Sequence, residues 1–421
     1  MHNEAGLRVS EHRWRWAFGA VLLARLLYPF FNSPLAHLFS DPLRHWENGA
    51  RFWNPDLIGA GDPYLYQLWI HLLRTWSGDS PPVVQLACGL LCAAMPYGWY
   101  RALRELVPRR IAYIGAIVIG LAPSLLAIYA YFMNETLLLS LSGFAFWASF
   151  RAARKRTLGA YVGASALWTA TVFTRSVVLP MALLCVGLLW LQSKPRPTKA
   201  VISTLILCVA AVTAGMHGMG RLNFFAPFGN VYLQEAYSYS GKRDYAIEVP
   251  GQGSWVFGSP AFYNPSLYPF SNWLTDRTGT VYIRIDVAHG RADWVAERDR
   301  VARERTFSWL TQYKEHTIYL LLGQPWPAND PASSVAWLGL WLRWLWPPII
   351  AFVAWGAIRR HFTGWEWLLP LAALGTLVLL AIEPMAIMEG RYRMPVDPIL
   401  LASAILLWHR TRTPAGEEAQ A

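Results

Sequence analysis

Long runs of apolar residues, separated by short polar connectors, recur along most of the chain. A helix needs about 20 mostly apolar residues to cross the hydrocarbon core of a bilayer. Runs of this kind predict ten spans, at residues 14–31, 83–101, 111–131, 135–151, 157–174, 176–192, 199–219, 335–358, 365–383 and 395–409. The pattern therefore predicts an all-α polytopic membrane protein with about ten transmembrane helices.

Lys and Arg predict the orientation of these spans, because cytoplasmic connectors carry an excess of basic residues. With the N-terminus inside, the cytoplasmic segments hold 18 Lys and Arg residues, in the N-terminal segment, 101–110, 151–156, 194–199, 359–360 and the tail after 409. The three short outer connectors hold only three, which are Arg175, Arg391 and Arg393. Ten spans satisfy every connector, so both termini are predicted to be cytoplasmic.

Two long segments, 32–82 and 220–334, then fall on the outer side. We therefore divide the chain into three regions: an N-terminal transmembrane region that includes the first outer loop (1–219), a large outer loop (220–334), and a C-terminal transmembrane region with a short cytoplasmic tail (335–421).

Each outer segment is predicted to carry an interfacial helix. After Asp41 and Pro42, apolar residues recur on one helical face, at Leu43, Trp46, Ala50 and Trp53. The charged stretch 291–310 predicts a second helix at the membrane surface. Residues 224–280, rich in Gly, Pro, Tyr and Phe, predict an ordered irregular loop.

Composition supports the membrane interpretation. The chain is 54% hydrophobic and only 15% charged, whereas soluble domains are about 25% charged. Its net charge of +11 lies mostly in the connectors, which argues against a nucleic-acid partner, and its 23 Trp residues suit interfacial belts. Four cysteines without metal-ligand neighbours are expected to be small buried residues, and the first apolar run lacks a signal-peptide cleavage site.

Polar residues at membrane boundaries are the candidates for chemistry, because they are costly there unless they have a function. The predicted outer face carries Asp41, Asn134, Glu135, Arg175, Arg391 and Arg393. Structural alternatives exist: Asp41, Asn134 and Glu135 are suited to cap helices, and Arg175 to reach the interface as an anchor. Arg391 and Arg393 have positive charge where the topology rule disfavours it. Arg25 and Arg343, inside predicted spans, are assigned structural roles.

At these residues the chain resembles the GT-C glycosyltransferases, in particular the branch of protein O-mannosyltransferases, aminoarabinose transferases and bacterial relatives. The similar stretches run from about 22 to 400 and are ARLLYPFFNSPLAHLFSDPLRHWENGARFWNPDLIGAGDPYLYQLWIHLL, NETLLLSL, FTRSVVLP, ARERTFSWLTQYKEH and GRYRMPVDPIL. Two departures stand out. Ser176 replaces the usual Pro of a Thr-Arg-Pro turn, and Asp41 is followed by Pro42, so the family's second carboxylate beside the first is missing.

The resemblance implies an inverting transfer of a sugar from a polyprenyl-phosphate donor to a lipid, glycan or protein acceptor. It places the reaction at the outer face of an inner (plasma) membrane. Asp41 is then expected to act as the base, and Arg175, Arg391 and Arg393 to hold the donor phosphate. His45, Asn134, Glu135 and Tyr392 are expected to shape the substrate site. No metal constellation is visible in the sequence, so we expect action without a metal or cofactor.

Three alternatives compete with this interpretation. A transporter or flippase of lipid-linked glycans is marked by repeat symmetry and mid-membrane charges, and the sequence has no visible repeat. A membrane scaffold has no need of clustered Arg and Asp. A relative of the bacterial oligosaccharide ligases is the alternative within the enzymes.

Overall fold

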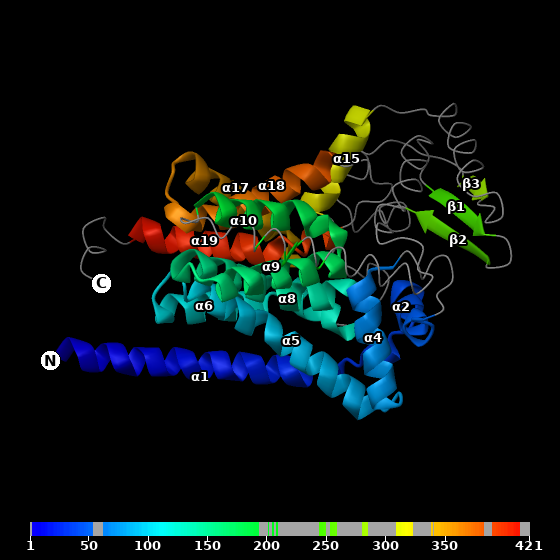
Figure 1. Cartoon of the computed structure of the whole chain (residues 1–421), viewed down its shortest axis with the longest axis horizontal. Coiled ribbons are helices and arrows are strands. Elements are labelled where there is room, and N and C mark those ends of the chain that lie inside the picture. The colour runs from blue at the N-terminus through cyan, green and yellow to red at the C-terminus, as the bar shows by residue number, and fades with distance from the viewer. Residues whose placement is uncertain are drawn as a thin grey trace.

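The protein is almost entirely helical in the part of the chain that its computed structural model describes (Figure 1). The description covers residues 2–53, 62–192, 201, 204–205, 208, 244–249, 253–258, 280–284, 309–322, 338–339, 341–382 and 390–412. Most of the segment 199–219, most of the large loop 220–334 and the predicted surface helix up to residue 308 lie outside it.

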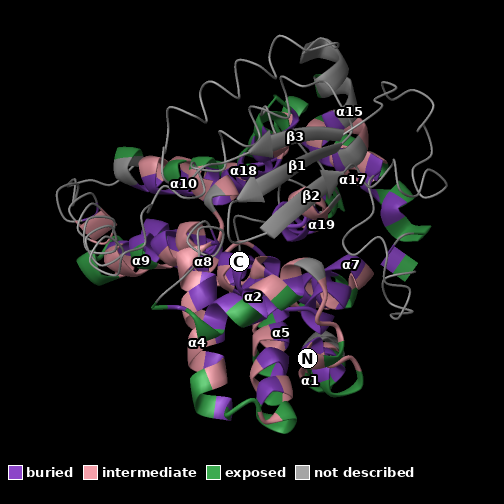
Figure 2. Cartoon of the chain, turned by 90° about the vertical axis from the view of Figure 1, so that its right-hand side faces the viewer, coloured by how far each residue is buried: buried purple, intermediate pink, exposed green. Residues whose placement is uncertain are grey.

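The longer helices lie side by side in one bundle (Figure 1). They are α1 (His2–Phe31), α5 (Pro81–Leu103), α6 (Arg109–Leu121), α8 (Asn134–Lys155), α9 (Leu158–Thr174), α10 (Leu179–Gln192), α17 (Trp346–Ile358), α18 (Leu368–Ile382) and α19 (Asp397–Arg412). The bounds of α5, α8, α9, α10, α18 and α19 lie within about four residues of the predicted spans, whereas α1 begins earlier, α6 ends earlier and α17 begins later than predicted. Figure 2 shows buried residues mainly on the helix faces that are turned toward the middle of the molecule.

Shorter elements connect these helices. They are η1 (Pro34–Ala36), α2 (Ser40–Ala50), α4 (Tyr64–Ser77), α7 (Pro123–Ala127), η2 (Ile128–Ala130), η3 (Ser176–Val178), α15 (Trp309–Leu322), η6 (Arg343–Leu345), η7 (Gly364–Trp367) and η8 (Gly390–Arg393). Both α2 and α4 belong to the first predicted outer loop, and most of its described residues are therefore helical. Arg343, in η6, is buried just before α17 and not within it.

Three helical segments in the described chain are long and apolar enough to cross a bilayer: Pro81–Leu103, Asn134–Lys155 and Gly364–Ile382. A fourth candidate is the pair Arg109–Leu121 and Pro123–Ala130, which is bent by 66°. Large apolar side chains such as Leu90 are exposed on the outside of the bundle, as expected where lipid takes the place of water. The structure is thus consistent with a helical membrane protein, while the number of ten spans stays a prediction.

Close helix packing depends on glycine at two crossings. A Cβ added to Gly89 of α5 would lie 2.2 Å from the carbonyl oxygen of Leu26 in α1. A Cβ added to Gly143 of α8 would lie 2.6 Å from the backbone nitrogen of Trp99 in α5. Small residues of this kind let helix backbones approach closely within a membrane.

Arg25 joins three helices at two proline-induced breaks. Pro96 has no N–H, so the carbonyl of Cys92 lacks its usual donor within α5, and Arg25 Nε donates to it at 2.8 Å. The break before Pro123 similarly exposes carbonyls at the α6–α7 bend. The Arg25 guanidinium donates to Gly120 at 2.8 Å and to Leu125 at 2.9 Å. The structural role expected for Arg25 is therefore confirmed.

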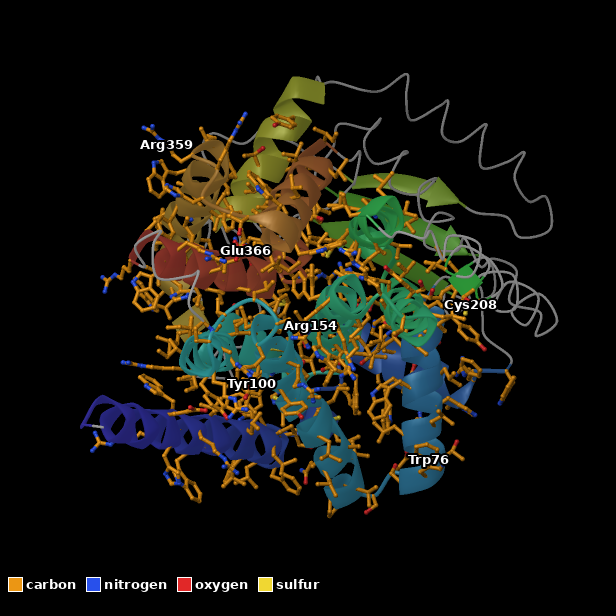
Figure 3. The ribbon with its side chains drawn as sticks, turned by 60° about the vertical axis from the view of Figure 1, so that its left-hand side comes forward. Trp76, Tyr100, Arg154, Cys208, Arg359 and Glu366 are labelled. Atoms are coloured by element: carbon orange, nitrogen blue, oxygen red, sulfur yellow. The ribbon has the colours of Figure 1, made fainter. Side chains whose placement is uncertain are left out.

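Ion pairs show which helix ends lie together. The end of the bundle where α1 begins and α19 terminates has pairs that join neighbouring helix ends, namely Arg109–Glu11, Arg154–Glu105 and Arg410–Glu366. Figure 3 labels Arg154, Arg359 and Glu366 toward this end and Trp76 of α4 on the far side. The basic connectors 101–110, 151–156 and 359–360 thus gather at one end, which we call the basic end. The helix α2 and η8 lie at the opposite end.

A small sheet corrects the all-α expectation. The strands β1 (Asp244–Val249), β2 (Gly253–Gly258) and β3 (Thr280–Arg284) have the order β2-β1-β3, with β1 antiparallel to β2 and parallel to β3. The strands β1 and β2 lie within the segment 224–280, for which the sequence predicts irregular loop. Figure 1 shows the sheet beyond the bundle, on the side that carries α2.

The cysteines follow the prediction with one exception. Cys88, Cys92 and Cys185 are buried, whereas Cys208 is only partly buried. All four are free thiols.

Candidate functional site

The site begins at Asp41, in the first turn of α2. The N-cap of α2 is Phe39 and no side chain makes a capping hydrogen bond there, so the capping interpretation of Asp41 does not hold. Its carboxylate is paired instead with two arginines. Arg391 Nη1 lies 2.7 Å from Asp41 Oδ2, and Arg44 Nη1 lies 3.0 Å from Asp41 Oδ1.

The next link is Tyr392, the neighbour of Arg391 in η8. The guanidinium carbon of Arg391 lies 5.5 Å from the centre of the Tyr392 ring, and that of Arg175 lies 4.9 Å from it. One phenol ring therefore serves two cations, which are attracted to its electron-rich face. Arg391 and Tyr392 both belong to η8, which ends a few residues before α19 begins. Their position therefore depends on where α19 starts.

Arg175 continues the chain of contacts to α8. It follows α9 in an extended conformation and precedes η3. Its Nη1 forms an ion pair with Glu135 Oε1 and donates to Asn134 Oδ1 at 3.3 Å. Both acceptors belong to the first turn of α8, where negative charge is favoured by the helix dipole. Arg175 is therefore more than an interfacial anchor.

A second carboxylate reaches the cluster from elsewhere in the chain. Asp62 Oδ1 lies 3.2 Å from Arg44 Nη2, so Arg44 bridges Asp41 and Asp62. Asn48 Nδ2 also donates to Asp62 Oδ2 at 2.8 Å. The fold thus brings a second carboxylate close to Asp41. Its only signal in the sequence is the Gly-Asp step that ends at Asp62.

His45 lies behind these acids. It is 2% exposed, its Nδ1 is 2.7 Å from Gln67 Nε2 and 3.5 Å from Asp62 Oδ2, and its ring packs edge-on against Tyr66. In this arrangement His45 acts on the site by positioning Asp62, and it is too deeply buried to line an open surface.

Arg393 is directed away from the other candidates. It is fully buried, its Nε donates to Asp397 Oδ1 at 2.8 Å, and its Nη1 donates to the carbonyls of Leu320 and Leu321. Its guanidinium carbon lies 4.7 Å from the ring centre of Trp346. Arg393 therefore attaches the end of α15 to the start of α19. The i, i+4 spacing of Arg393 and Asp397 in the sequence is a signal for this pairing.

The cluster, which we call the charged relay, comprises Asp41, Arg44, Asp62, Asn134, Glu135, Arg175, Arg391 and Tyr392. It balances three guanidinium groups against three carboxylates. Two of its buried atoms, Arg44 Nε and Glu135 Oε2, have no hydrogen-bond partner in the described part of the chain. Buried polar atoms without partners are costly, so they are places where a polar ligand would be favoured.

The arginines of the relay hold Asp41 and Asp62 in the ionised form. Burial raises the pKa of Asp41, but the charges of Arg44 and Arg391 outweigh it and hold that pKa well below its usual range. For Asp62, burial is again the largest single effect, and the charge of Arg44 together with neighbouring donors lowers its pKa. A carboxylate with so low a pKa is a weak base while its arginines remain in place.

Two comparisons with known proteins add no family assignment. No model of a known protein family matches the chain, and no curated protein matches it significantly. The fold and the site therefore define a class in physical terms. It is a helical protein with apolar helices of membrane-spanning length and a charged relay at one end of its bundle. Within the described residues, no three His, Cys, Asp or Glu side chains are arranged to hold a metal ion.

Proposed function

We propose that this protein is a glycosyltransferase that moves a sugar from a polyprenyl-phosphate donor to an acceptor at the outer face of a membrane. The charged relay carries the proposal. Four segments far apart in the sequence meet there, around Asp41, Glu135, Arg175 and Arg391. These are the residues on which the resemblance to GT-C glycosyltransferases rests, and that resemblance alone does not require them to touch.

Asp41 is the proposed base. It accepts the proton of an acceptor hydroxyl, whose oxygen attacks the anomeric carbon of the sugar from the side opposite the phosphate. The bond between that carbon and the phosphate oxygen breaks, polyprenyl phosphate departs, and the anomeric configuration inverts. Arg391 and Arg175 neutralise the charge on the departing phosphate. One preorganised contact of this type contributes about 3 kcal/mol to the transition state.

The ion pair between Asp41 and Arg391 gives the reaction an order. A donor phosphate offers Arg391 an alternative anionic partner, which can accept two parallel hydrogen bonds. When Arg391 moves from Asp41 to the phosphate, Asp41 loses one of the charges that lower its pKa and becomes a better base. Donor binding therefore precedes activation of the acceptor in this scheme.

The arrangement of the bundle suits a lipid-linked donor. Its polyprenyl chain stays in the bilayer while the phosphate and sugar reach polar groups at the helix ends. The basic end and the charged relay lie at opposite ends of the bundle. With basic connectors in the cytoplasm, ten spans place the relay on the outer side, facing the periplasm or the exterior of an inner (plasma) membrane.

Transport of a lipid-linked glycan is the alternative. Arg25, a buried cation inside the bundle, is engaged by three backbone carbonyls and lies 5.1 Å from the Tyr129 ring centre, so it offers no obvious mid-membrane binding site. The test is mass spectrometry of lipid extracts from cells with and without the protein. A transferase requires that the deletion accumulates a polyprenyl-phosphate sugar and lacks a glycan. If purified protein leaves a polyprenyl-phosphate sugar intact but moves it across a vesicle membrane, the alternative is correct.

A further inference from the structure

A second cluster of cations lies at the basic end, far from the charged relay. Arg101 of α5 and Arg151 of α8 both face the indole of Trp147, with guanidinium carbons 4.4 Å and 5.2 Å from its ring centre. Arg101 also donates to the hydroxyl of Tyr97 at 3.1 Å. Arg101, Trp147 and Arg151 are all half-buried. Two like charges therefore contact one aromatic ring, with their guanidinium carbons at most about 9.6 Å apart.

Neither of these arginines pairs with an acid in the described chain. The nearby carboxylate of Glu105 is engaged by Arg154 at 2.9 Å. Two neighbouring guanidinium groups repel each other, and an anion between them relieves that repulsion while forming charge-assisted hydrogen bonds. Both groups contact the same indole, and a phosphate has several oxygens that can accept hydrogen bonds from more than one arginine.

An exposed apolar stripe leads along α5 to this cluster. Leu86, Leu90 and Tyr97 are all exposed and recur at helical spacing, and Arg101 follows Tyr97 by one turn. Leu90 and Arg101 are separated by about 16 Å along the helix axis at a rise of 1.5 Å per residue. That distance is about half the 30 Å thickness of a hydrocarbon core. The stripe thus has the length of one lipid leaflet, with the two arginines at headgroup level.

We propose that Arg101, Trp147 and Arg151 form a binding site for an anionic phospholipid, whose phosphate pairs with the arginines and whose acyl chains lie along the stripe on α5. Charge complementarity selects this occupant over a zwitterionic lipid. In a zwitterionic headgroup the amine neutralises the phosphate, so the arginines gain less. Aromatic residues at the interface favour the same depth in the membrane.

The test measures lipid binding to the purified full chain by native mass spectrometry in detergent. Phosphatidylglycerol is compared with phosphatidylcholine carrying the same acyl chains. One basic residue near an anionic lipid surface contributes about 1 kcal/mol, so two favour phosphatidylglycerol about 30-fold, or about 2 kcal/mol. The substitution of Arg101→Gln with Arg151→Gln is expected to remove this preference.

A matched control distinguishes lipid binding at this specific site from general electrostatic attraction of anionic lipids to the basic end. Arg359→Gln with Arg360→Gln removes two exposed charges from the same end and is expected to leave the preference intact. Arg101→Lys with Arg151→Lys retains both charges and is expected to retain most of it, which keeps the test valid if the Gln pair fails to fold. Glycerol phosphate, which has no acyl chains, is expected not to compete.

Several results would overturn the proposal. One is equal binding of the two lipids by the unmodified protein. Another is a preference for phosphatidylglycerol that persists after Arg101→Gln with Arg151→Gln. A third is a preference that falls equally after Arg359→Gln with Arg360→Gln. Competition by glycerol phosphate at concentrations matched to the lipid would indicate a soluble phosphate ligand and would equally refute a lipid site.

Discussion

Substitution of Asp41 by Asn removes both the proposed base and an ion pair, so its effects on transfer rate and on stability are measured separately, with a second substitution that tests the stability effect. The carboxylate pairs with Arg391 and Arg44, and the exposed fractions of the three side chains are 20%, 14% and 28%. Loss of one partner costs about 3–5 kcal/mol for a fully buried pair and at most about 1 kcal/mol at the surface. Asp41→Asn is therefore expected to lower the free energy of unfolding by about 2 kcal/mol.

Most of that loss is expected at Arg391. Arg44 keeps Asp62 as a partner after the substitution, whereas Arg391 loses Asp41. Arg391→Gln in the same chain removes the charge that the ion pair had balanced and is expected to restore part of the lost stability. In both variants the rate of sugar transfer is expected to be about a hundredfold to ten-thousandfold lower than in the unmodified protein, because an amide accepts no proton at neutral pH.

The assay is the rate of sugar transfer by purified protein, together with thermal unfolding of each variant. Glu135→Gln is the control, because it also deprives an arginine of its partner but leaves the proposed base intact. A near-normal rate in Asp41→Asn would refute base catalysis by this residue. Recovery of the rate together with stability in the double variant would refute both base catalysis by Asp41 and binding of the donor phosphate by Arg391. An equal loss in Glu135→Gln would leave the base open between the two acids.

The pH dependence of stability gives an independent check on the ion pair. Because the pKa of Asp41 is lowered in the folded protein, its contribution to stability is fully present above the ordinary carboxyl pKa of about 4. The contribution is lost as the pH falls below that value toward the lower folded pKa. Stability of Asp41→Asn is expected to fall less steeply on acidification than that of the unmodified protein, as measured by unfolding temperatures from pH 5 downward. Parallel curves would contradict the pairing.

Three further predictions follow from the relay, the topology and the buried brace. Arg391→Lys is expected to recover only part of the donor affinity lost in Arg391→Ala, because an ammonium lacks the guanidinium fork; normal turnover in Arg391→Ala at low and saturating donor would exclude the residue from the mechanism. Reporter fusions at positions 155, 196 and 415 are expected to report cytoplasm, and fusions within 230–300 the outer side; a cytoplasmic result for the large loop would overturn the sidedness. Arg25→Leu is expected to destabilise the protein by at least about 3 kcal/mol, since three buried carbonyls lose their donor; an unchanged unfolding temperature would refute the brace.

Helix positions follow well from the apolar pattern because each span must bury a fixed length of chain. The predicted spans 83–101 and 135–151 correspond to Pro81–Leu103 and Asn134–Lys155. The predicted span 111–131 is instead broken at Ala122, before Pro123. Proline disfavours the helical conformation of the residue before it. Pro123 was therefore a local signal for the break, but the length of the apolar run predicted one continuous span.

The site was less predictable than the helices, because side-chain direction depends on packing between distant segments. The sequence singles out Asp41, Arg175 and Arg391, and the structure brings them into one relay. The sequence analysis also groups Arg393 with these residues, but in the structure its guanidinium group donates to a carbonyl at the end of α15 and lies outside the relay. Asp62 was missed as a site residue because only the fold carries it to Arg44. The strands were missed although YAIEV and WVFG have the β-branched and aromatic residues typical of strands.

The brace made by Arg25 has a consequence for how the chain is assembled during synthesis. In the proposed arrangement α1 is the first helix to reach the membrane. Arg25 lies within its apolar C-terminal part, and an arginine at the centre of a membrane-spanning helix opposes insertion by about 2.5–3.5 kcal/mol. The acceptors of Arg25 lie on α5, α6 and α7, which are made later. We expect the first helix to be retained near the insertion machinery until those partners arrive. A truncated chain that ends before α6 would then expose an unsatisfied cation, by which membrane quality control could recognise it.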